Sequence, residues 1–273
     1  MNKVKIKEIM TTNPIVVSPD MAATKVRSLF REERVRCFPV VNNGKLEGVI
    51  TRGDVLRITS TRSNITVKGL MEKPTVLLTP DADVMDAVKR LVSAKKTHAL
   101  IIKDSTSMEL IGIVSVFDIF QSFLDAKIRP KKEKIKDIFT ENPVVCDYED
   151  PIYKVWDKMN ESGYSGLPVL KNGKLIGIIT RKDIIDSGYV RINRESKKHV
   201  RKNIEVYRVM KTPPVAVTKE DDVYDAMKLM IEKDIGRLPV VENPEYINNE
   251  SYVVRRADLI GIVTRKDILK AYV

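Results

Sequence analysis

Cysteine and histidine, the residues that build disulfide frameworks and most metal centres, are scarce in this chain. Its 273 residues contain two cysteines and two histidines. A structural zinc site needs about four such ligands at short spacings, and a disulfide framework needs several closely spaced cysteines. The sequence therefore predicts neither a metal site nor a disulfide-bonded fold.

Long apolar runs are also missing, and the chain starts without the apolar stretch of a signal peptide. No run approaches the ~20 residues that a membrane-spanning helix requires. The opening MNKVKIKEIM leads directly into polar sequence. We therefore expect a cytoplasmic protein that does not cross a membrane.

Motifs of the common catalytic sites are absent as well. Gly44-Lys45 and Gly173-Lys174 are not followed by the Ser or Thr of a P-loop, and no Gly-x-Gly-x-x-Gly is present. No pair of nucleophile and general base stands out. We expect a binding protein and not an enzyme.

Negative charge is in the minority. Lys and Arg number 48 against 37 Asp and Glu, which leaves a formal net charge of +11. An excess of this size favours anionic partners such as nucleotides, nucleic acid, acidic protein surfaces or anionic lipid. It does not choose among them.

What the sequence does contain is one segment repeated four times. Each copy opens on proline and apolar β-formers, reaches a second apolar strand, and closes on Gly–apolar–apolar–Thr/Ser-x-x-Asp. The offset from the opening proline to the second strand is 25, 26, 25 and 25 residues, measured over Pro14–Pro39, Pro74–Leu100, Pro143–Pro168 and Pro214–Pro239. An offset held so closely indicates duplication.

Each copy is predicted to fold as strand, helix, strand, strand, helix, which is an α/β unit. Apolar residues on one face indicate the first helix, such as Val84, Ala87 and Leu91 in the second copy. Hairpin turns such as Asn172-Gly173 indicate the strand pair. A unit of ~55 residues buries little surface alone, so the copies should pair sheet to sheet into two modules.

The predicted boundaries follow the repeats. Copies one to four are assigned to residues 1–65, 66–125, 126–190 and 204–273, and the two modules to 1–125 and 126–273, divided near the basic stretch Asp125–Lys134. Two insertions interrupt the pattern. Tyr189–Asn203 lies between the third and fourth copies, and Glu242–Asp258 lengthens the fourth hairpin and is predicted as a loop.

These signals resemble the CBS domain, and four tandem copies without an attached enzyme or channel resemble the γ-subunit type of AMP-activated protein kinase. The resemblance covers nearly the whole chain. It implies two modules in a pseudo-symmetric disc, with AMP, ADP or ATP in clefts between paired repeats, and a regulatory role as an energy-state sensor for a partner protein. A homodimer stays open, as does another adenosine ligand such as S-adenosylmethionine or NAD.

The closing Thr/Ser-x-x-Asp element has a structural and a functional interpretation. A hydroxyl at the start of a helix with an acid three residues later is a capping box. A helix start also attracts phosphate, and a short acid can accept hydrogen bonds from ribose hydroxyls. By resemblance, the ribose role falls to Asp54, Asp118, Asp183 and Asp267, and the positions near phosphate are Thr51, Ser115, Thr180 and Thr264.

Basic and apolar residues beside the strands complete the predicted sites. By resemblance, phosphate contacts fall to positions just before the second strand and just before the Asp, which carry Arg36, Arg237, Ser165, His98, Lys182 and Lys266. Arg36 and Arg237 are the strongest candidates because a guanidinium pairs bidentately with phosphate, although surface arginines are common in so charged a chain. The expected adenine walls are Ile15 and Val35 in the first copy, Val144 and Tyr164 in the third, and Val215 and Ile235 in the fourth.

The second copy departs most from the pattern. It has Leu100 in place of the proline, Phe117 before its Asp, and Ser115 in place of Thr. A site at Asp118 is therefore in doubt, and between two and four occupied sites are expected.

A competing hypothesis from another class is nucleic-acid binding through the basic segments Lys131–Lys134 and Arg191–Lys202. Neither segment has many of the interleaved aromatic residues on which bases stack. Basic runs of this kind are more often solvated linkers, so nucleotide binding is the preferred prediction.

Overall fold

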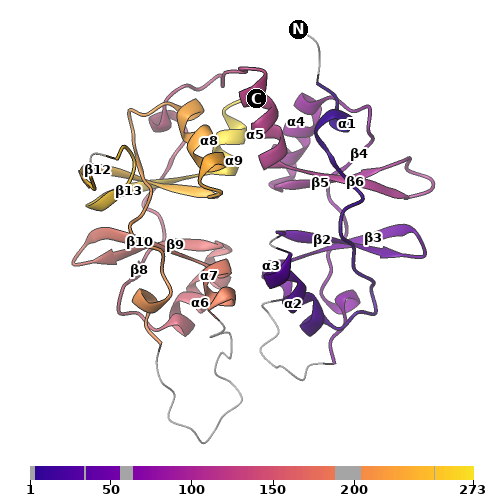
Figure 1. The fold of residues 1–273 in the computed structure, drawn as a ribbon, viewed down its shortest axis with the longest axis horizontal. Coiled ribbons are helices and arrows are strands. Elements are labelled where there is room, and N and C mark those ends of the chain that lie inside the picture. Colours follow the sequence, from indigo (N-terminus) through magenta and orange to yellow (C-terminus); the bar gives the residue numbers. More distant parts are fainter. Residues whose placement is uncertain (1–3, 34, 56–63, 188–203, 249) are drawn as a thin grey trace, which may run out of the picture.

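The computed structural model describes residues 4–33, 35–55, 64–187, 204–248 and 250–273. Four α/β units surround a common centre, with the first two copies in one half of the molecule and the last two in the other half (Figure 1). In each half the two sheets face each other, and the helices lie on their outer sides. The predicted pairing into two modules is confirmed.

The first module follows the predicted order of elements. The first copy contains α2 (Ala23–Glu32), β2 (Cys37–Asn42), β3 (Lys45–Thr51) and α3 (Arg52–Val55), and its opening strand is a single bridge from Val17 to Val40. The second copy contains β4 (Leu77–Leu78), α4 (Val84–Ala94), β5 (His98–Ile102), β6 (Leu110–Ser115) and α5 (Val116–Asp125).

The second module repeats this order. The third copy contains β8 (Cys146–Asp147), α6 (Ile152–Ser162), β9 (Gly166–Lys171), β10 (Lys174–Thr180) and α7 (Arg181–Asp186). The fourth copy contains β11 (Val217–Thr218), α8 (Val223–Glu232), β12 (Arg237–Tyr246), β13 (Val254–Thr264) and α9 (Arg265–Lys270). The predicted strand, helix, strand, strand, helix order is therefore confirmed.

Each copy is preceded by a short lead that the sequence analysis did not predict. The leads contain one helical turn each, at α1 (Ile6–Ile9), Val67–Gly69, Ile135–Asp137 and Val206–Arg208. Each turn fully buries its first residue, which is Ile6, Val67, Ile135 or Val206. The leads of the first and third copies continue into β1 (Thr11–Thr12) and β7 (Thr140–Glu141).

The leads are exchanged between the two copies of each module. β1 of the first copy pairs with β6 of the second copy, and β7 of the third pairs with β13 of the fourth. The leads of the second and fourth copies return through single bridges to β3 and β10. The four contacts are Thr11–Ile113, Glu72–Val49, Thr140–Ile262 and Lys211–Ile178. Every copy therefore carries the lead of its partner on its last strand.

This exchange explains the recurring glycine of the closing signature. At Gly177, an added Cβ would lie 2.8 Å from the carbonyl oxygen of Lys211 and 2.9 Å from Sδ of Met210. The exchanged lead crowds Gly48, Gly112 and Gly261 in the same way. The glycine three residues before the Thr or Ser is therefore required by close backbone approach, and it carries no separate information about ligand binding.

A small apolar core lies between the two sheets of each module. In the first module it consists of Leu46, Leu100 and Ile102. In the second module it consists of Leu175, Ala216, Val241, Val254 and Ala257. These cores account for the predicted sheet-to-sheet pairing.

Two larger cores cross from one module to the other. One joins α5 of the second copy to α8 of the fourth, and in it Phe123 packs on Tyr272 with ring centroids 4.4 Å apart. The other joins the first and third copies and includes Phe30, Trp156 and Ile184. The modules are therefore held together by shared apolar packing as well as by the connecting chain.

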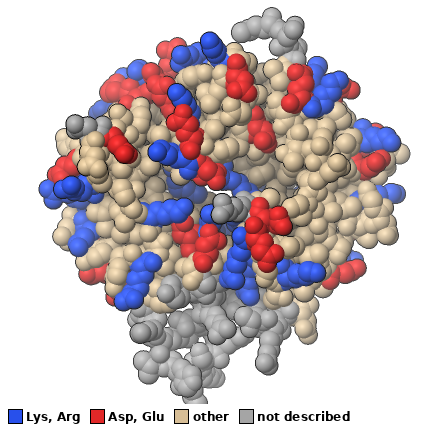
Figure 2. All heavy atoms as spheres, in the orientation of Figure 1, with Lys and Arg blue, Asp and Glu red and all other residues tan. Residues whose placement is uncertain are grey.

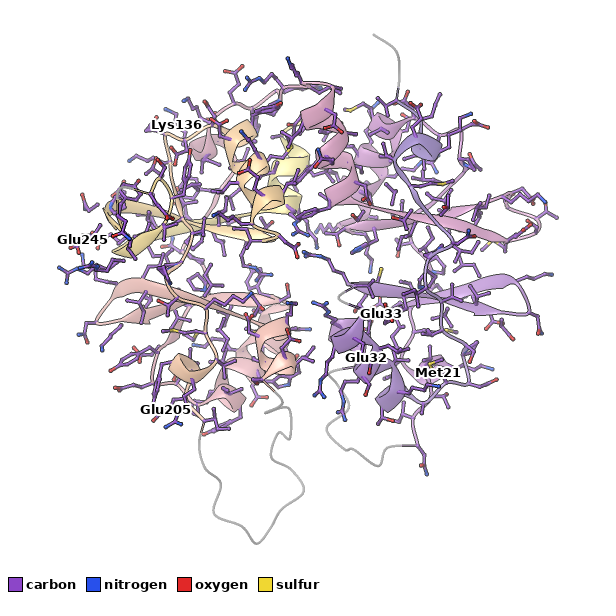
Figure 3. All side chains as sticks on the ribbon, viewed as in Figure 1. Met21, Glu32, Glu33, Lys136, Glu205 and Glu245 are labelled. Carbon is purple, nitrogen blue, oxygen red and sulfur yellow. The ribbon has the colours of Figure 1, made fainter. Side chains whose placement is uncertain are left out.

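The prediction of a loop at Glu242–Asp258 is wrong, because the hairpin of the fourth copy extends into this segment. β12 and β13 continue into this segment and pair as far as Tyr246 and Val254, with Glu245 at the outer edge of the molecule (Figure 3). The strand continues because Val254 is buried in the small core against the third copy. β13 also pairs with β10 at Ala257, so the sheets of the third and fourth copies are continuous.

The chain between the modules packs against the fourth copy. The backbone N–H of Lys131 donates to the carbonyl of Ala271 at 2.7 Å, and Nζ of Lys134 forms an ion pair with Asp222 at 3.0 Å. The predicted insertion at 189–203 lies outside the described residues.

We expect Gly177→Ala to lower the free energy of unfolding by about 1–3 kcal/mol, because the added methyl group meets the backbone of the exchanged lead. Gly69→Ala is the matched control, since a Cβ there would meet nothing closer than 3.5 Å. Denaturant unfolding followed by circular dichroism measures both. Equal losses of stability in the two variants would contradict the close approach.

Phe123→Ala removes an aromatic ring that the first module contributes to a shared core, and should lower stability by about 3–5 kcal/mol. The single tryptophan, Trp156, lies in the second module and reports its unfolding by fluorescence. We expect the Trp156 transition to move to lower denaturant together with the circular dichroism transition. A Trp156 transition identical to that of the parent protein would mean that the modules unfold independently.

Candidate functional site

In all four copies the Thr/Ser hydroxyl and backbone N–H donate to the aspartate of the Thr/Ser-x-x-Asp element, and in the second, third and fourth copies the element forms a capping box. Oδ2 of Asp267 accepts hydrogen bonds from the backbone N–H of Thr264 at 2.9 Å and from its hydroxyl at 2.6 Å. The same two bonds, between 2.5 and 2.8 Å long, form at Asp54, Asp118 and Asp183. The structural interpretation of the signature therefore holds in the second, third and fourth copies, and the first copy shares the two bonds to its aspartate.

The box uses one carboxylate oxygen of each aspartate and leaves Oδ1 for a second partner. Oδ1 of Asp183 lies 3.6 Å from Nζ of Lys211, and Oδ1 of Asp267 lies 3.9 Å from Nζ of Lys270. Both lysine side chains are largely exposed, so these ion pairs are weak. The structural and functional interpretations are compatible, because Oδ2 holds the carboxylate in place while Oδ1 can accept from a ligand.

A cleft of about 560 Å³ lies beside the box of the fourth copy. Its volume is in the range of small-molecule sites. Its lining comes from three copies, with Thr264, Lys266, Asp267 and Arg237 from the fourth, Asn142, Val144 and Tyr164 from the third, and Lys95 and Lys96 from the second.

Both copies of the second module contribute to the cleft, and the exchange of leads explains how they come together. Val144 and Tyr164 of the third copy lie with the signature of the fourth copy, and not with that of their own. Because β7 pairs with β13, the chain after Glu141 runs directly past the cleft. The predicted adenine wall and the predicted ribose acid in this cleft therefore belong to different copies.

Positive charge dominates this cleft. Among the described residues that line it, Asp267 is the one acidic side chain. Burial, followed by the neighbouring Lys96, lowers the pKa of Lys266. A bound anion would relieve the repulsion among the cations, which are Lys95, Lys96, Lys266, Lys270 and Arg237.

Arg237 is held in place by the third copy. Its Nη1 donates to the carbonyl of Gly166 and its Nη2 donates to Oγ of Ser165, both at 2.6 Å. Burial, followed by nearby Arg36, lowers the pKa of Arg237 to about 10, so the side chain stays cationic at neutral pH. The structure thus brings the predicted residues Arg237 and Ser165 together beside the cleft.

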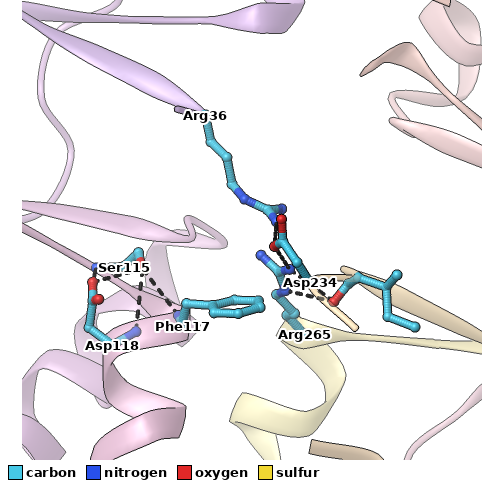
Figure 4. A network of polar contacts seen from close by, with 7 residues as sticks. Arg36, Ser115, Phe117, Asp118, Asp234 and Arg265 are labelled. Carbon is cyan, nitrogen blue, oxygen red and sulfur yellow. Dashed lines mark hydrogen bonds and ion pairs between the residues drawn. The ribbon is translucent and has the colours of Figure 1, made fainter. Parts of the chain in front are cut away.

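A second basic cluster lies at the centre of the molecule (Figure 4). Nη2 of Arg36 donates to Oδ1 of Asp234 at 3.0 Å, and Nη2 of Arg265 lies 3.6 Å from the same oxygen. The Arg265 guanidinium also packs over the ring of Phe117, 3.8 Å from its centroid. These contacts join the first, second and fourth copies, and Figure 2 shows charged side chains around a hollow in the middle of this face.

Arg265 is a candidate that the sequence reasoning missed. It follows Thr264 directly, is almost fully buried, and donates to the carbonyl of Ile235 at 2.9 and 3.2 Å. Burial, with Arg36 as the next cause, lowers its pKa to about 8. The sequence signal for this arginine is the dipeptide Thr-Arg, which begins the Thr/Ser-x-x-Asp element in three of the four copies.

The departure of the second copy has a physical reason. Phe117 serves as a platform for the guanidinium of Arg265. In the first copy the corresponding residue is Gly53, where an added Cβ would lie 2.8 Å from Nη1 of Arg181. Each of these positions therefore lies against an arginine of the opposite module. Phe117 stacks on Arg265, and Gly53 leaves room for Arg181 because it has no side chain.

His98 is a neutral member of the central region. Its Nδ1 lies 3.0 Å from Oγ1 of Thr97. Burial, followed by Arg36 and Arg265, lowers the pKa of His98 to about 4. At physiological pH the ring is therefore uncharged and can contact a phosphate only as a neutral donor.

The remaining predicted residues do not line the cleft beside Asp267. Lys182 forms an ion pair with Asp186 at 3.3 Å. Ile15 is 46% exposed. The other three, Val35, Val215 and Ile235, are partly buried against the two shared cores.

Metal and membrane sites find no support in the part of the chain that the structure describes. No group of three His, Cys, Asp or Glu side chains there is placed to hold a metal ion. No helix there is both long and apolar enough to cross a bilayer.

Two proteins of known structure resemble the whole chain. The chain is 28% identical to protein MJ1225 of Methanocaldococcus jannaschii, over 98% of its own length and 99% of that protein. The crystal structure of MJ1225, which has been proposed as an archaeal homologue of the AMP-activated protein kinase γ subunit, matches with a TM-score of 0.79 and 25% identity over 99% of this chain and 100% of the other. A Pyrococcus horikoshii protein shares the fold, with a TM-score of 0.68 and 23% identity over 99% and 100% of the two chains.

The family model of the CBS domain matches four segments, at residues 6–60, 67–125, 135–188 and 206–273. Each segment contains one of the four strand, helix, strand, strand, helix units. The chain therefore belongs to the CBS-domain family.

Proposed function

We propose that this protein binds the adenine nucleotides AMP, ADP or ATP in the cleft beside Asp267 and regulates a partner protein according to its occupancy. The observation that carries the proposal is the cleft, which combines a capped carboxylate, five cations and apolar walls in about 560 Å³. Ribose, phosphate and adenine need these three kinds of surface. The likeness to MJ1225 supports nucleotide sensing, since that protein has been proposed as a γ-subunit homologue.

Each part of the nucleotide has residues of matching chemistry in the cleft. Oδ1 of Asp267 can accept from the ribose hydroxyls while Oδ2 stays in the capping box. Arg237 and Lys266 can supply charge-assisted hydrogen bonds to phosphate. Val144 and Tyr164 can pack on adenine, and the Tyr164 side chain is accessible to an incoming base.

Side chains of both modules line the cleft, which provides a physical basis for regulation. Lys95 and Lys96 follow α4 of the first module, whereas Asp267 lies in α9 of the second. A ligand whose phosphates attract both lysines would favour the module packing in which they are close to it. A partner protein that recognises this packing would then respond to the nucleotide.

Other adenosine ligands can be ranked by their charge. S-Adenosylmethionine has no phosphate, and its single carboxylate is outweighed by its ammonium and sulfonium groups, so it would bring no net negative charge to the cations of the cleft. NAD carries a pyrophosphate and would satisfy them, although its nicotinamide half needs additional space. We therefore expect AMP, ADP and ATP to bind more tightly than S-adenosylmethionine.

Nucleic-acid binding is the weaker candidate. Within Lys131–Lys134, the backbone of Lys131 is bonded to Ala271 and the side chain of Lys134 is paired with Asp222. This segment is therefore occupied by contacts to the fourth copy. The other basic segment, Arg191–Lys202, lies outside the described residues.

Asp267→Ala should weaken AMP binding by about tenfold to a hundredfold, because each hydrogen bond to a charged acceptor contributes about 1.5–3 kcal/mol. Isothermal titration calorimetry of the full chain measures the change. Asp118→Ala is the matched control, since it removes the same capping box but belongs to the second copy. Equal affinities of the parent protein and Asp267→Ala for AMP would sink the ribose role.

Lys266→Gln should weaken ATP binding by about tenfold and S-adenosylmethionine binding by less than about twofold, because only ATP offers phosphate oxygens to the lysine. The control is Lys182→Gln, the same position in the third copy, which is already paired with Asp186. Competition titrations with the three proteins give the ratios. An equal loss for both ligands would point to a general packing role for Lys266.

A further inference from the structure

Asp234 is unusual among the residues that precede the second strand of each copy. It lies five positions before Pro239, in the turn after α8, and has a positive φ of 47°. The corresponding positions of the other copies carry Arg34, Lys95 and Gly163. An acidic side chain at this point therefore occurs only in the fourth copy.

The carboxylate of Asp234 bridges two guanidinium groups (Figure 4). Its Oδ1 accepts a hydrogen bond from Arg36 at 3.0 Å and lies 3.6 Å from Nη2 of Arg265. The two arginines belong to different modules, so one oxygen atom joins the first copy to the fourth. A single oxygen engages only a few of the N–H donors that two guanidinium groups carry.

Asp234 balances only part of the positive charge around it. Four arginines form what we call the central arginine cluster, which consists of Arg36, Arg52, Arg237 and Arg265. Burial is the first cause and Arg36 the second cause of a lowered pKa in each of the other three. The acids that act against this effect are Asp183, Asp186 and Asp234. The cluster therefore has the charge to attract a further anion.

The two sides of the Asp234 contact differ in their exposure to solvent. The Asp234 side chain is 79% exposed, and that of Arg265 is 7% exposed. Arg265 is fixed by the carbonyl of Ile235 and by the ring of Phe117. The carboxylate can thus move into solvent while the buried guanidinium stays in place.

We propose that Asp234 is an internal competitor, whose carboxylate occupies an anion site of the central arginine cluster until a phosphate-bearing ligand displaces it. A phosphate group has three acceptor oxygens and can pair with Arg36 and Arg265 at the same time. It would replace an exposed and weakly held carboxylate. Ligands with more negative charge would compete better, so Asp234 would set a threshold of charge for binding.

Displacement also changes how the modules are connected. The ion pair between Arg36 and Asp234 runs directly from the first copy to the fourth. When a ligand takes the place of the carboxylate, this polar link between the modules passes through the ligand, in addition to the two shared apolar cores. The role of Asp234 in selecting nucleotides rests on the proposed function. The anion site itself rests only on the residues of the central arginine cluster.

The test is titration of the full chain with inorganic pyrophosphate, which contains neither adenine nor ribose. Asp234→Asn should bind pyrophosphate about three- to tenfold more tightly than the parent protein, because the competing charge is gone. Asn keeps the positive φ readily. Asp81→Asn is the matched control, because Asp81 of the second copy is also 79% exposed and is ion-paired with Lys7 of the first copy, and it should leave the affinity unchanged.

A third variant tests whether the gain in pyrophosphate affinity arises at the contact between Asp234 and Arg36. Arg36→Gln in the Asp234→Asn background should remove the gain in pyrophosphate affinity, since both changes act on one contact. The proposal is overturned if Asp234→Asn binds no more tightly than the parent, if Asp81→Asn gains equally, if the gain survives Arg36→Gln, or if none of the proteins binds pyrophosphate at millimolar concentration. AMP titrations of Asp267→Ala are separate, so failure of adenosine recognition and failure of the anion site give different results.

Discussion

The approach of a lead carbonyl to the signature glycine of the neighbouring copy is the contact on which the rest of the molecule depends. At Gly177 and its counterparts a side chain would push the exchanged lead away from the last strand. Without that contact, β7 would not lie on β13, and Val144 would not reach the box of Asp267. The cleft beside Asp267 is consequently built from three copies, and no single repeat supplies its whole lining.

The parts of the fold that could be predicted are those encoded by local pattern. The fixed offsets, the Asn-Gly turns and the capping boxes each depend on residues within one copy. The leads could not be predicted, because a turn of three residues such as Val67–Gly69 has no periodicity and packs on another copy. The fourth hairpin was mistaken for a loop because its Asn and Pro residues outweighed Val254, whose burial depends on the third copy. Arg265 was missed for the same reason, since its environment is built by Phe117 and Asp234, far away in the sequence.

The candidate site shows how a repeated sequence acquires unequal copies. The same two hydrogen bonds to the aspartate form in all four copies, so the signature itself does not distinguish one copy from another. The distinction comes from the variable positions of the signature and from the residues of other copies that pack around it. Phe117 carries a stacked arginine in the second copy, Gly53 makes room for one in the first, and Asp267 faces a cleft with five cations in the fourth. Charge at the centre is concentrated by folding, because residues distant in the chain converge there.

The continuous sheet of the second module has a mechanical consequence. β10 and β13 are joined at Ala257, and an ion pair of 2.6 Å between Lys174 and Asp258 lies beside the junction. In the first module the two sheets remain separate, and at the corresponding place they meet through one bridge from Lys45 to Glu109. We therefore expect the second module to be the stiffer half of the molecule. If the two modules move relative to each other, we expect most of the deformation to occur in the first module, while the second module keeps its shape.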